Sequence, residues 1–299
     1  MDLSIWAMQA FNGLSTFCVL LLMALGLAII FGQMGVINMA HGEFLTIGAY
    51  TTFLLSQGGV LGDWFQTWYF PVAIVVSFML AFAIGWLVER FMVRHLYRRP
   101  LDTLLATWGL SLVMQQSFRS GFGAREVSAT LPDWLMGSLK PTPTIDIPIN
   151  GLFMMGLTAV LTGLVVFGLT RTRFGVWVRA TVQNRAMASA AGINTRRVDE
   201  LTFAIGCGLA GIAGAAFTTI GSTGPTSGSL YIVDTFLVVV FGGAERLIGT
   251  ILSAFSIAQT QATTEFFMTG SMAKVLTLST IILILMLRPQ GLFSIKVRR

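Results

Sequence analysis

The sequence of 299 residues has little charge, because Asp, Glu, Lys and Arg make up only 11% of it. Soluble domains usually carry about 25% charged residues. Hydrophobic residues make up 55% of the chain, and the mean hydropathy is +0.78. These values exclude an ordinary soluble domain. We expect an all-α fold: one polytopic membrane helical bundle that comprises residues 1–299.

Cysteine and histidine are scarce. The two cysteines, Cys18 and Cys207, both lie in apolar segments, so they indicate neither a disulfide framework nor a metal site. The two histidines, His41 and His95, are too few for a typical zinc site. We therefore expect no metal and no cofactor.

The chain lacks the motifs of several common enzyme classes. It has no G-x-x-x-x-G-K-[ST], so it does not bind ATP through a P-loop, and it has no H-E-x-x-H or G-x-S-x-G. His41 and Glu43 are two residues apart, a spacing that suits neither a helical zinc pair nor a packed dyad. We predict that the chain is not an enzyme.

Positive charge is concentrated in three clusters. Fourteen of the 19 Lys and Arg residues lie at 90–99, 171–197 and 288–299. Such clusters are typical of cytoplasmic loops in membrane proteins, so we do not expect nucleic acid as a partner. This pattern places the loops 56–70 and 121–150 and the N-terminus outside, and the C-terminus in the cytoplasm.

Nine apolar segments predict about eight or nine membrane crossings. One of them, 231–243, is short and ends in Gly-Gly, so it is either a crossing or a re-entrant segment. Within another, Gly206, Ala210, Gly214 and Thr218 recur every four residues and predict close helix packing. The nine segments are 14–33, 36–56, 70–90, 102–119, 149–170, 200–220, 231–243, 246–267 and 272–288.

Two glycine-containing stretches interrupt the apolar pattern. The first, "FGQMGVINMAHGEF", predicts a helix break at Gly32, Gly35 and Gly42, with Glu43 in a structural role. The second, "VVVFGGAERLIGT", predicts a break at Gly242 and Gly243. Paired breaks of this kind are typical of a transport pathway, although each is equally compatible with an ordinary turn between hairpin helices.

Polar side chains near the first break are candidates for contact with a substrate. On a helix over 36–56, Asn38 and His41 share a face that Glu43 does not. Farther along the chain, Thr107, Ser111 and Gln115 follow at intervals of four and form a polar stripe. The stripe either lines a water-filled route or hydrogen-bonds a neighbouring helix.

Several stretches resemble the permease subunits of ABC importers for branched-chain amino acids and urea. The similarity rests on "GLAIIFGQMGVINMAHGEFLTIGAY" and on "RTRFGVWVRATVQNRAMASAAGINTRRVDELTFAIGCGLAGIAG". Three further stretches are closer to the urea branch and its first permease subunit: "RPLDTLLATWGLSLVMQQSFR", "SLYIVDTFLVVVFGG" and "AKVLTLSTIILILMLRPQGLFSIKVRR". The resemblance extends over nearly the whole chain.

This resemblance implies an importer half in the bacterial cytoplasmic membrane. Its partners would be a second, related permease, two cytoplasmic ATPase subunits and a substrate-binding protein outside. The cytoplasmic segment 171–198 would couple to an ATPase through Arg185, Gly192, Asn194 and Arg196. Urea or a short amide is the expected substrate, with a branched-chain amino acid as the alternative. A transporter or channel that works without an ATPase would instead need a membrane acid, for which Glu43 and Asp234 are the candidates.

Overall fold

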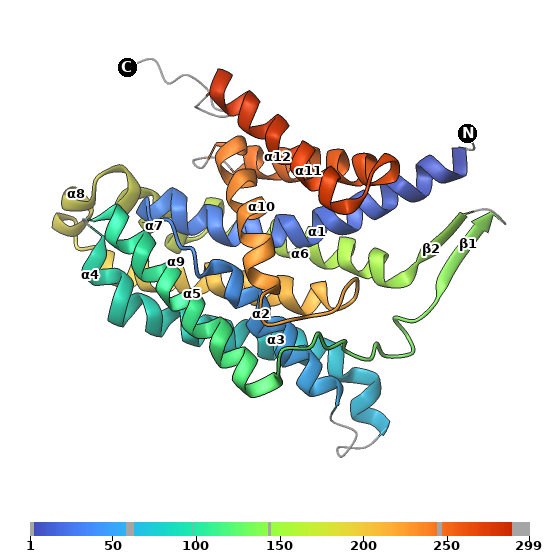
Figure 1. The fold of residues 1–299 in the computed structure, drawn as a ribbon. Coiled ribbons are helices and arrows are strands. Elements are labelled where there is room, and N and C mark those ends of the chain that lie inside the picture. Colours follow the sequence, from blue (N-terminus) through green and yellow to red (C-terminus); the bar gives the residue numbers. More distant parts are fainter. Residues whose placement is uncertain (1–2, 58–62, 98, 143–144, 244–246, 289–299) are drawn as a thin grey trace.

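Two long helices, α1 (Leu3–Met34) and α9 (Thr195–Phe217), form the centre of the bundle (Figure 1). The computed structural model describes residues 3–57, 63–97, 99–142, 145–243 and 247–288. α1 lacks proline and is rich in Leu, Met and Ala, which are strong helix formers. Both helices are mostly buried, as expected for helices that other elements surround.

The remaining helices pack around this pair. A two-stranded antiparallel hairpin precedes α6. The other elements are α2 (His41–Ser56), α3 (Asp63–Val88), a π-helical turn η2 (Glu89–Val93), α4 (Arg94–Leu96), α5 (Pro100–Phe122), β1 (Ser138–Thr142), β2 (Ile145–Pro148), α6 (Ile149–Arg171), α7 (Arg173–Gln183), α8 (Arg185–Ala190), α10 (Ser227–Gly242), α11 (Leu247–Phe267) and α12 (Gly270–Leu287).

The structure confirms the predicted helical membrane bundle. Each of the nine predicted segments overlaps one of the helices α1, α2, α3, α5, α6, α9, α10, α11 and α12. Five helical stretches in the described part of the chain are long and apolar enough to cross a membrane, in α1, α3 to α4, α6, α9 and α12. The short segment 231–243 corresponds to α10, which has 16 residues and runs across α1 in Figure 1.

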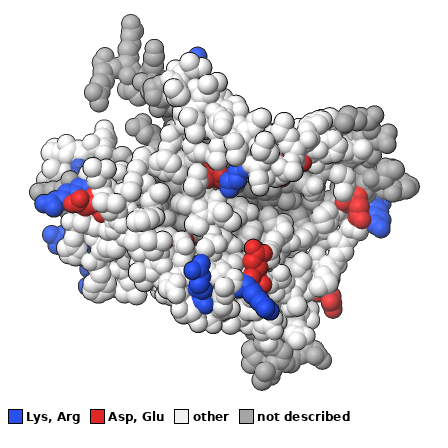
Figure 2. All heavy atoms as spheres, viewed as in Figure 1, with Lys and Arg blue, Asp and Glu red and all other residues white. Residues whose placement is uncertain are grey.

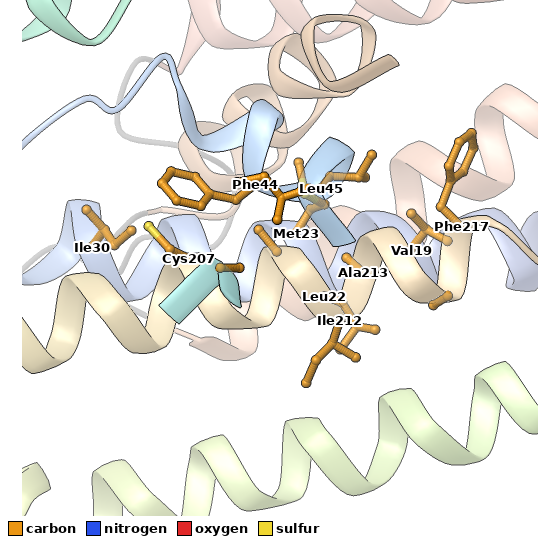
Figure 3. Packing of buried hydrophobic residues seen from close by; sticks show 14 of the residues in the cluster. Val19, Leu22, Met23, Ile30, Phe44, Leu45, Cys207, Ile212, Ala213 and Phe217 are labelled. Carbon is orange, nitrogen blue, oxygen red and sulfur yellow. The ribbon is translucent and has the colours of Figure 1, made fainter. Parts of the chain in front are cut away.

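Glycines allow α9 to approach its neighbours closely, as the small-residue stripe predicted. A Cβ atom added at Gly214 would lie 1.9 Å from the Leu45 carbonyl oxygen of α2. One added at Gly206 would lie 2.6 Å from the Gly26 carbonyl oxygen of α1. The stripe therefore brings backbones into contact, and apolar side chains from α1, α2 and α9 pack beside it (Figure 3).

Few charged side chains lie on the surface of the bundle. Figure 2 shows a mostly uncharged face, with charged side chains at its left end, where α4 and α8 lie, at its right end, near the hairpin, and at a few places between them. Arg94 of the first basic cluster and Arg185 and Arg196 of the second line one hollow at the left end. The first two basic clusters thus lie together, as a shared cytoplasmic position requires. Most of the third cluster, at residues 296–299, lies outside the described residues.

One ion pair lies between two apolar helices, α10 and α12. Lys274 Nζ is 2.9 Å from Asp234 Oδ2 and 3.0 Å from the Leu230 carbonyl oxygen. We expect Lys274→Met to lower the melting temperature of the purified protein by roughly 2–4 °C, because it leaves a largely buried carboxylate unpaired. Lys140→Met is the control, since its ion pair with Asp146 is exposed. Equal shifts in the two variants, measured by thermal unfolding in detergent, would contradict this account.

Candidate functional site

The first predicted break is present and lies between α1 and α2. α1 ends at Met34, and Gly35 follows with φ of +63° and an amide that donates to the Phe31 carbonyl oxygen at 2.9 Å. This arrangement is a common way to end a helix with glycine. Two details of the prediction were wrong. Gly32 is helical within α1, and α2 begins at His41, so Asn38 does not lie on its helical face.

His41 anchors the beginning of α2 deep inside the bundle. Its side chain is fully buried, and Nε2 lies 3.2 Å from the Met23 carbonyl oxygen of α1. Met23 precedes the end of α1 by 11 residues, which is about 16 Å along the helix axis. This distance is about half of the roughly 30 Å thickness of the apolar core of a bilayer.

Asn38 and Thr107 shape the nonhelical segment 35–40 that leads back to this depth. Asn38 Oδ1 accepts a hydrogen bond from the Ala40 amide at 3.1 Å. Thr107 Oγ1 of α5 accepts one from the Met39 amide, also at 3.1 Å. Backbone groups in apolar surroundings need such partners. Both residues had been predicted on a substrate route, and in the structure they satisfy the backbone.

Glu43 joins the polar stripe of α5 to α2. Its Oε1 accepts hydrogen bonds from Ser111 Oγ and from Gln115 Nε2, each at 2.9 Å. Gln115 Nε2 also lies 3.0 Å from Ser111 Oγ, and the Glu43 side chain is fully buried. The stripe therefore hydrogen-bonds a neighbouring helix, which was one of its two predicted roles. The Glu43 carboxylate is the acceptor that these two side chains of the stripe share.

Aromatic rings lie farther along the same two helices. Tyr50, seven residues after Glu43, stacks on Phe122 of α5 with ring centroids 4.1 Å apart. Phe118, three residues after Gln115, lies 5.5 Å from the Tyr50 ring. Aromatic rings thus follow the buried carboxyl group of Glu43 along the interface between α2 and α5.

The N-terminus of α10 lies against the N-terminus of α2. A Cβ atom added at Gly228, in the first turn of α10, would lie 2.2 Å from the Gly42 carbonyl oxygen, and one added at Gly42 would lie 2.2 Å from the Gly228 carbonyl oxygen. The Gly228 amide also donates to Thr46 Oγ1 at 3.0 Å. The two helix N-termini meet through glycine backbones. Gly42 therefore permits a close contact and is not a breaking residue.

The second predicted break lies at the opposite end of α10. Gly242 is the last residue of α10, and Gly243 follows with φ of +83°. A Cβ atom added at Gly242 would lie 2.5 Å from the Gly249 carbonyl oxygen, so α10 and α11 pack as a close hairpin. These glycines support the alternative of an ordinary turn. The charged residues Glu245 and Arg246 lie outside the described residues.

The predicted coupling segment forms two short helices, α7 and α8, at the end of the bundle. Asn184 and Asn194 cap α8 and α9, accepting hydrogen bonds from the Met187 and Arg197 amides at 3.0 and 3.2 Å. Gly192 turns the chain between them with φ of +85°. Met187 is 67% exposed, so α8 carries an apolar side chain at the surface.

Comparison with known proteins identifies the family. Residues 9–287 match the family described as "Branched-chain amino acid transport system / permease component". This chain belongs to that permease family. Permeases of this family are subunits of transport systems, and with its apolar helices this chain is a multi-pass membrane protein.

Several curated permeases are similar to this member of the family over two thirds or more of their length. It is 28% identical to the high-affinity branched-chain amino acid transport system permease protein LivH of Escherichia coli K12, over 96% of this chain and 94% of LivH. It is 28% identical to BraD of Pseudomonas aeruginosa, over 96% and 95% of the two chains. It is 27% identical to LivM of Escherichia coli K12, over 91% and 67%. No solved structure matches the chain.

Proposed function

We propose that this permease imports branched-chain amino acids as one half of an ABC importer. The observation that carries the proposal is the meeting of a buried carboxylate, Glu43, with the N-termini of α2 and α10 near the middle of the bundle. Helix N-termini at membrane depth favour a substrate carboxylate. The Glu43 carboxylate would face the ammonium group, and the rings of Tyr50, Phe118 and Phe122 would contact the aliphatic side chain.

Urea, the substrate that the sequence favoured, fits this site less well. Urea is neutral and needs amides, hydroxyls and carbonyls, which Asn38, Ser111 and Gln115 could supply. Urea has no charged group to pair with a buried carboxylate and no aliphatic side chain to pack against aromatic rings. The curated relatives LivH and BraD are also named as branched-chain amino acid permeases, and these names support the same choice.

The other subunits follow from the same proposal. LivH and LivM of one organism are both similar to this chain, so we infer a second, related permease as its partner. The exposed surface of α7, α8 and the first turn of α9, with Met187, Arg185 and Arg196, would dock on a cytoplasmic ATPase. A binding protein would deliver substrate outside the bacterial inner membrane, where we expect the N-terminus to lie.

Uptake in intact cells tests the substrate. We expect loss of this gene, with the ATPase genes intact, to abolish uptake of radiolabelled leucine at micromolar concentration and to leave urea uptake unchanged. Restoration of the gene on a plasmid is the control. Loss of urea uptake alone would overturn the proposed substrate, and leucine uptake that survives removal of the ATPase would overturn the ABC mechanism.

A further inference from the structure

A charged cluster that the transport site does not use links the coupling segment to the end of α1. Asp199 is only 1% exposed and lies one turn into α9. It forms an ion pair with Arg185 at the start of α8, and its Oδ1 accepts a hydrogen bond from Gln33 Nε2 at 3.5 Å. Gln33 precedes the break at Gly35 by two residues. One buried carboxylate thus contacts both segments.

A second contact ties the same end of α1 to α3 and α4. The Tyr97 hydroxyl donates to Glu89 Oε1 in the π-helical turn and lies 3.9 Å from Met34 Sδ. Burial raises the pKa of Tyr97, so this hydroxyl remains a donor. The Arg185 guanidinium lies over the Tyr97 ring, 5.5 Å from its centroid. The end of α1 is therefore held between α8 and α4.

A hollow of about 430 Å³ separates these elements and is lined by the cluster. Two of the arginines that line it, Arg94 and Arg185, already pair with carboxylates, so the hollow offers little net charge to a free anion. Protein interiors are otherwise close-packed and resist movement. Open space beside an ion pair lets α8 shift relative to α4 without unpacking the core.

We propose that Asp199 is a positioning residue that transmits movement of the coupling segment, through Arg185 and Gln33, to the break between α1 and α2. The ATPase moves α8, and the ion pair carries that movement to Asp199. The hydrogen bond to Gln33 then shifts the end of α1. Because segment 35–40 leads directly to His41, the shift changes the position of the α2 N-terminus at the substrate site. This inference rests on the proposed function.

Labelling of the break tests the proposal independently of the substrate. A cysteine at Ile37, which is partly buried in segment 35–40, is reacted with a maleimide in the assembled importer. In the otherwise wild-type permease, the labelling rate of this cysteine should change several-fold between the nucleotide-free and vanadate-trapped states. In Asp199→Asn we expect that change to be lost while ATP hydrolysis continues, because the charge that holds Arg185 is gone. Asp199→Glu keeps the charge and should retain most of the change.

The matched control is Asp146→Asn, which removes an ion pair with Lys140 on the hairpin at the other end of the bundle. It should leave labelling unchanged. If Asp199→Asn does not assemble, Arg185→Gln removes the same ion pair from its exposed side. The proposal is overturned if labelling still responds in these variants, or if it never responds in the wild type. Failure of leucine uptake with an intact labelling response would instead overturn the proposed substrate.

Discussion

Replacing Glu43 with Gln is expected to lower leucine uptake at least about 30-fold. Removing one partner of a buried charge pair costs about 2 kcal/mol or more, and 1.4 kcal/mol corresponds to a factor of ten. Glutamine keeps the size of the side chain and can still bond Ser111 and Gln115. It cannot balance the charge of a substrate ammonium. The measurement is initial uptake of labelled leucine, normalised to the amount of permease in the membrane.

The control for this substitution is Glu265→Gln at the exposed end of α11, where Glu265 accepts a hydrogen bond from Gln261 at 3.0 Å. That variant should transport normally. ATP hydrolysis by the importer is measured as well. Normal hydrolysis in Glu43→Gln places the defect at the site, whereas lost hydrolysis indicates a failure of assembly. Wild-type uptake in Glu43→Gln would show that the carboxylate serves only to hold α5 against α2.

The glycine contact between α2 and α10 predicts the second large effect. Gly228→Ala should reduce uptake at least about tenfold, because its Cβ atom would lie 2.2 Å from the Gly42 carbonyl oxygen and 2.6 Å from Thr46 Oγ1. Such overpacking costs about 1–3 kcal/mol and forces the backbones apart. The two helix N-termini would then no longer converge on one substrate.

Gly163→Ala on α6 is the matched control, since no atom lies within 4 Å of a Cβ atom built there. Uptake and thermal stability are measured for both variants. We expect Gly163→Ala to match the wild type in both and Gly228→Ala to lose uptake more than stability. Equal behaviour of the two alanine variants would show that the close approach has no role in transport.

The membrane bundle and its first break could be predicted from composition and glycine position alone. Hydropathy identified segments that all contain helices, and Gly35 directly follows Met34, the last residue of α1. The position at which α2 begins could not be predicted. It depends on the contact of His41 with a carbonyl group of α1, and that contact has no local sequence signal.

The site was predicted only in part, because its residues come together through tertiary packing. Ser111 and Gln115 were recognised as a stripe, but their partner Glu43 was assigned to another face of a helix that was expected to begin earlier. The start of α10 was missed, although "STGPT" before it is rich in turn-forming residues. Asp199 was missed because the adjacent acids Asp199 and Glu200 at the end of a basic loop give no hint of burial.

The substrate, too, could not be predicted from local sequence. Urea was expected from the resemblance of three stretches to the urea branch, with Asn38 as a candidate substrate contact, whereas in the structure Asn38 bonds the Ala40 amide. A side chain that satisfies the backbone has less capacity to bind a substrate. In the proposed function, the Glu43 carboxylate and the rings of Tyr50, Phe118 and Phe122 would bind a zwitterion with an aliphatic side chain. Local sequence reveals which groups are polar, but only the fold shows how they are used.

ATP-driven uptake by the purified importer tests the central claim most directly. The chain, its second permease and the ATPase subunits are reconstituted in liposomes with ATP inside and the binding protein outside, and labelled leucine and labelled urea are compared. We predict that leucine accumulates only when ATP is present and that urea does not accumulate. ATP-dependent accumulation of urea without leucine, or leucine entry that needs no ATP, would contradict the account.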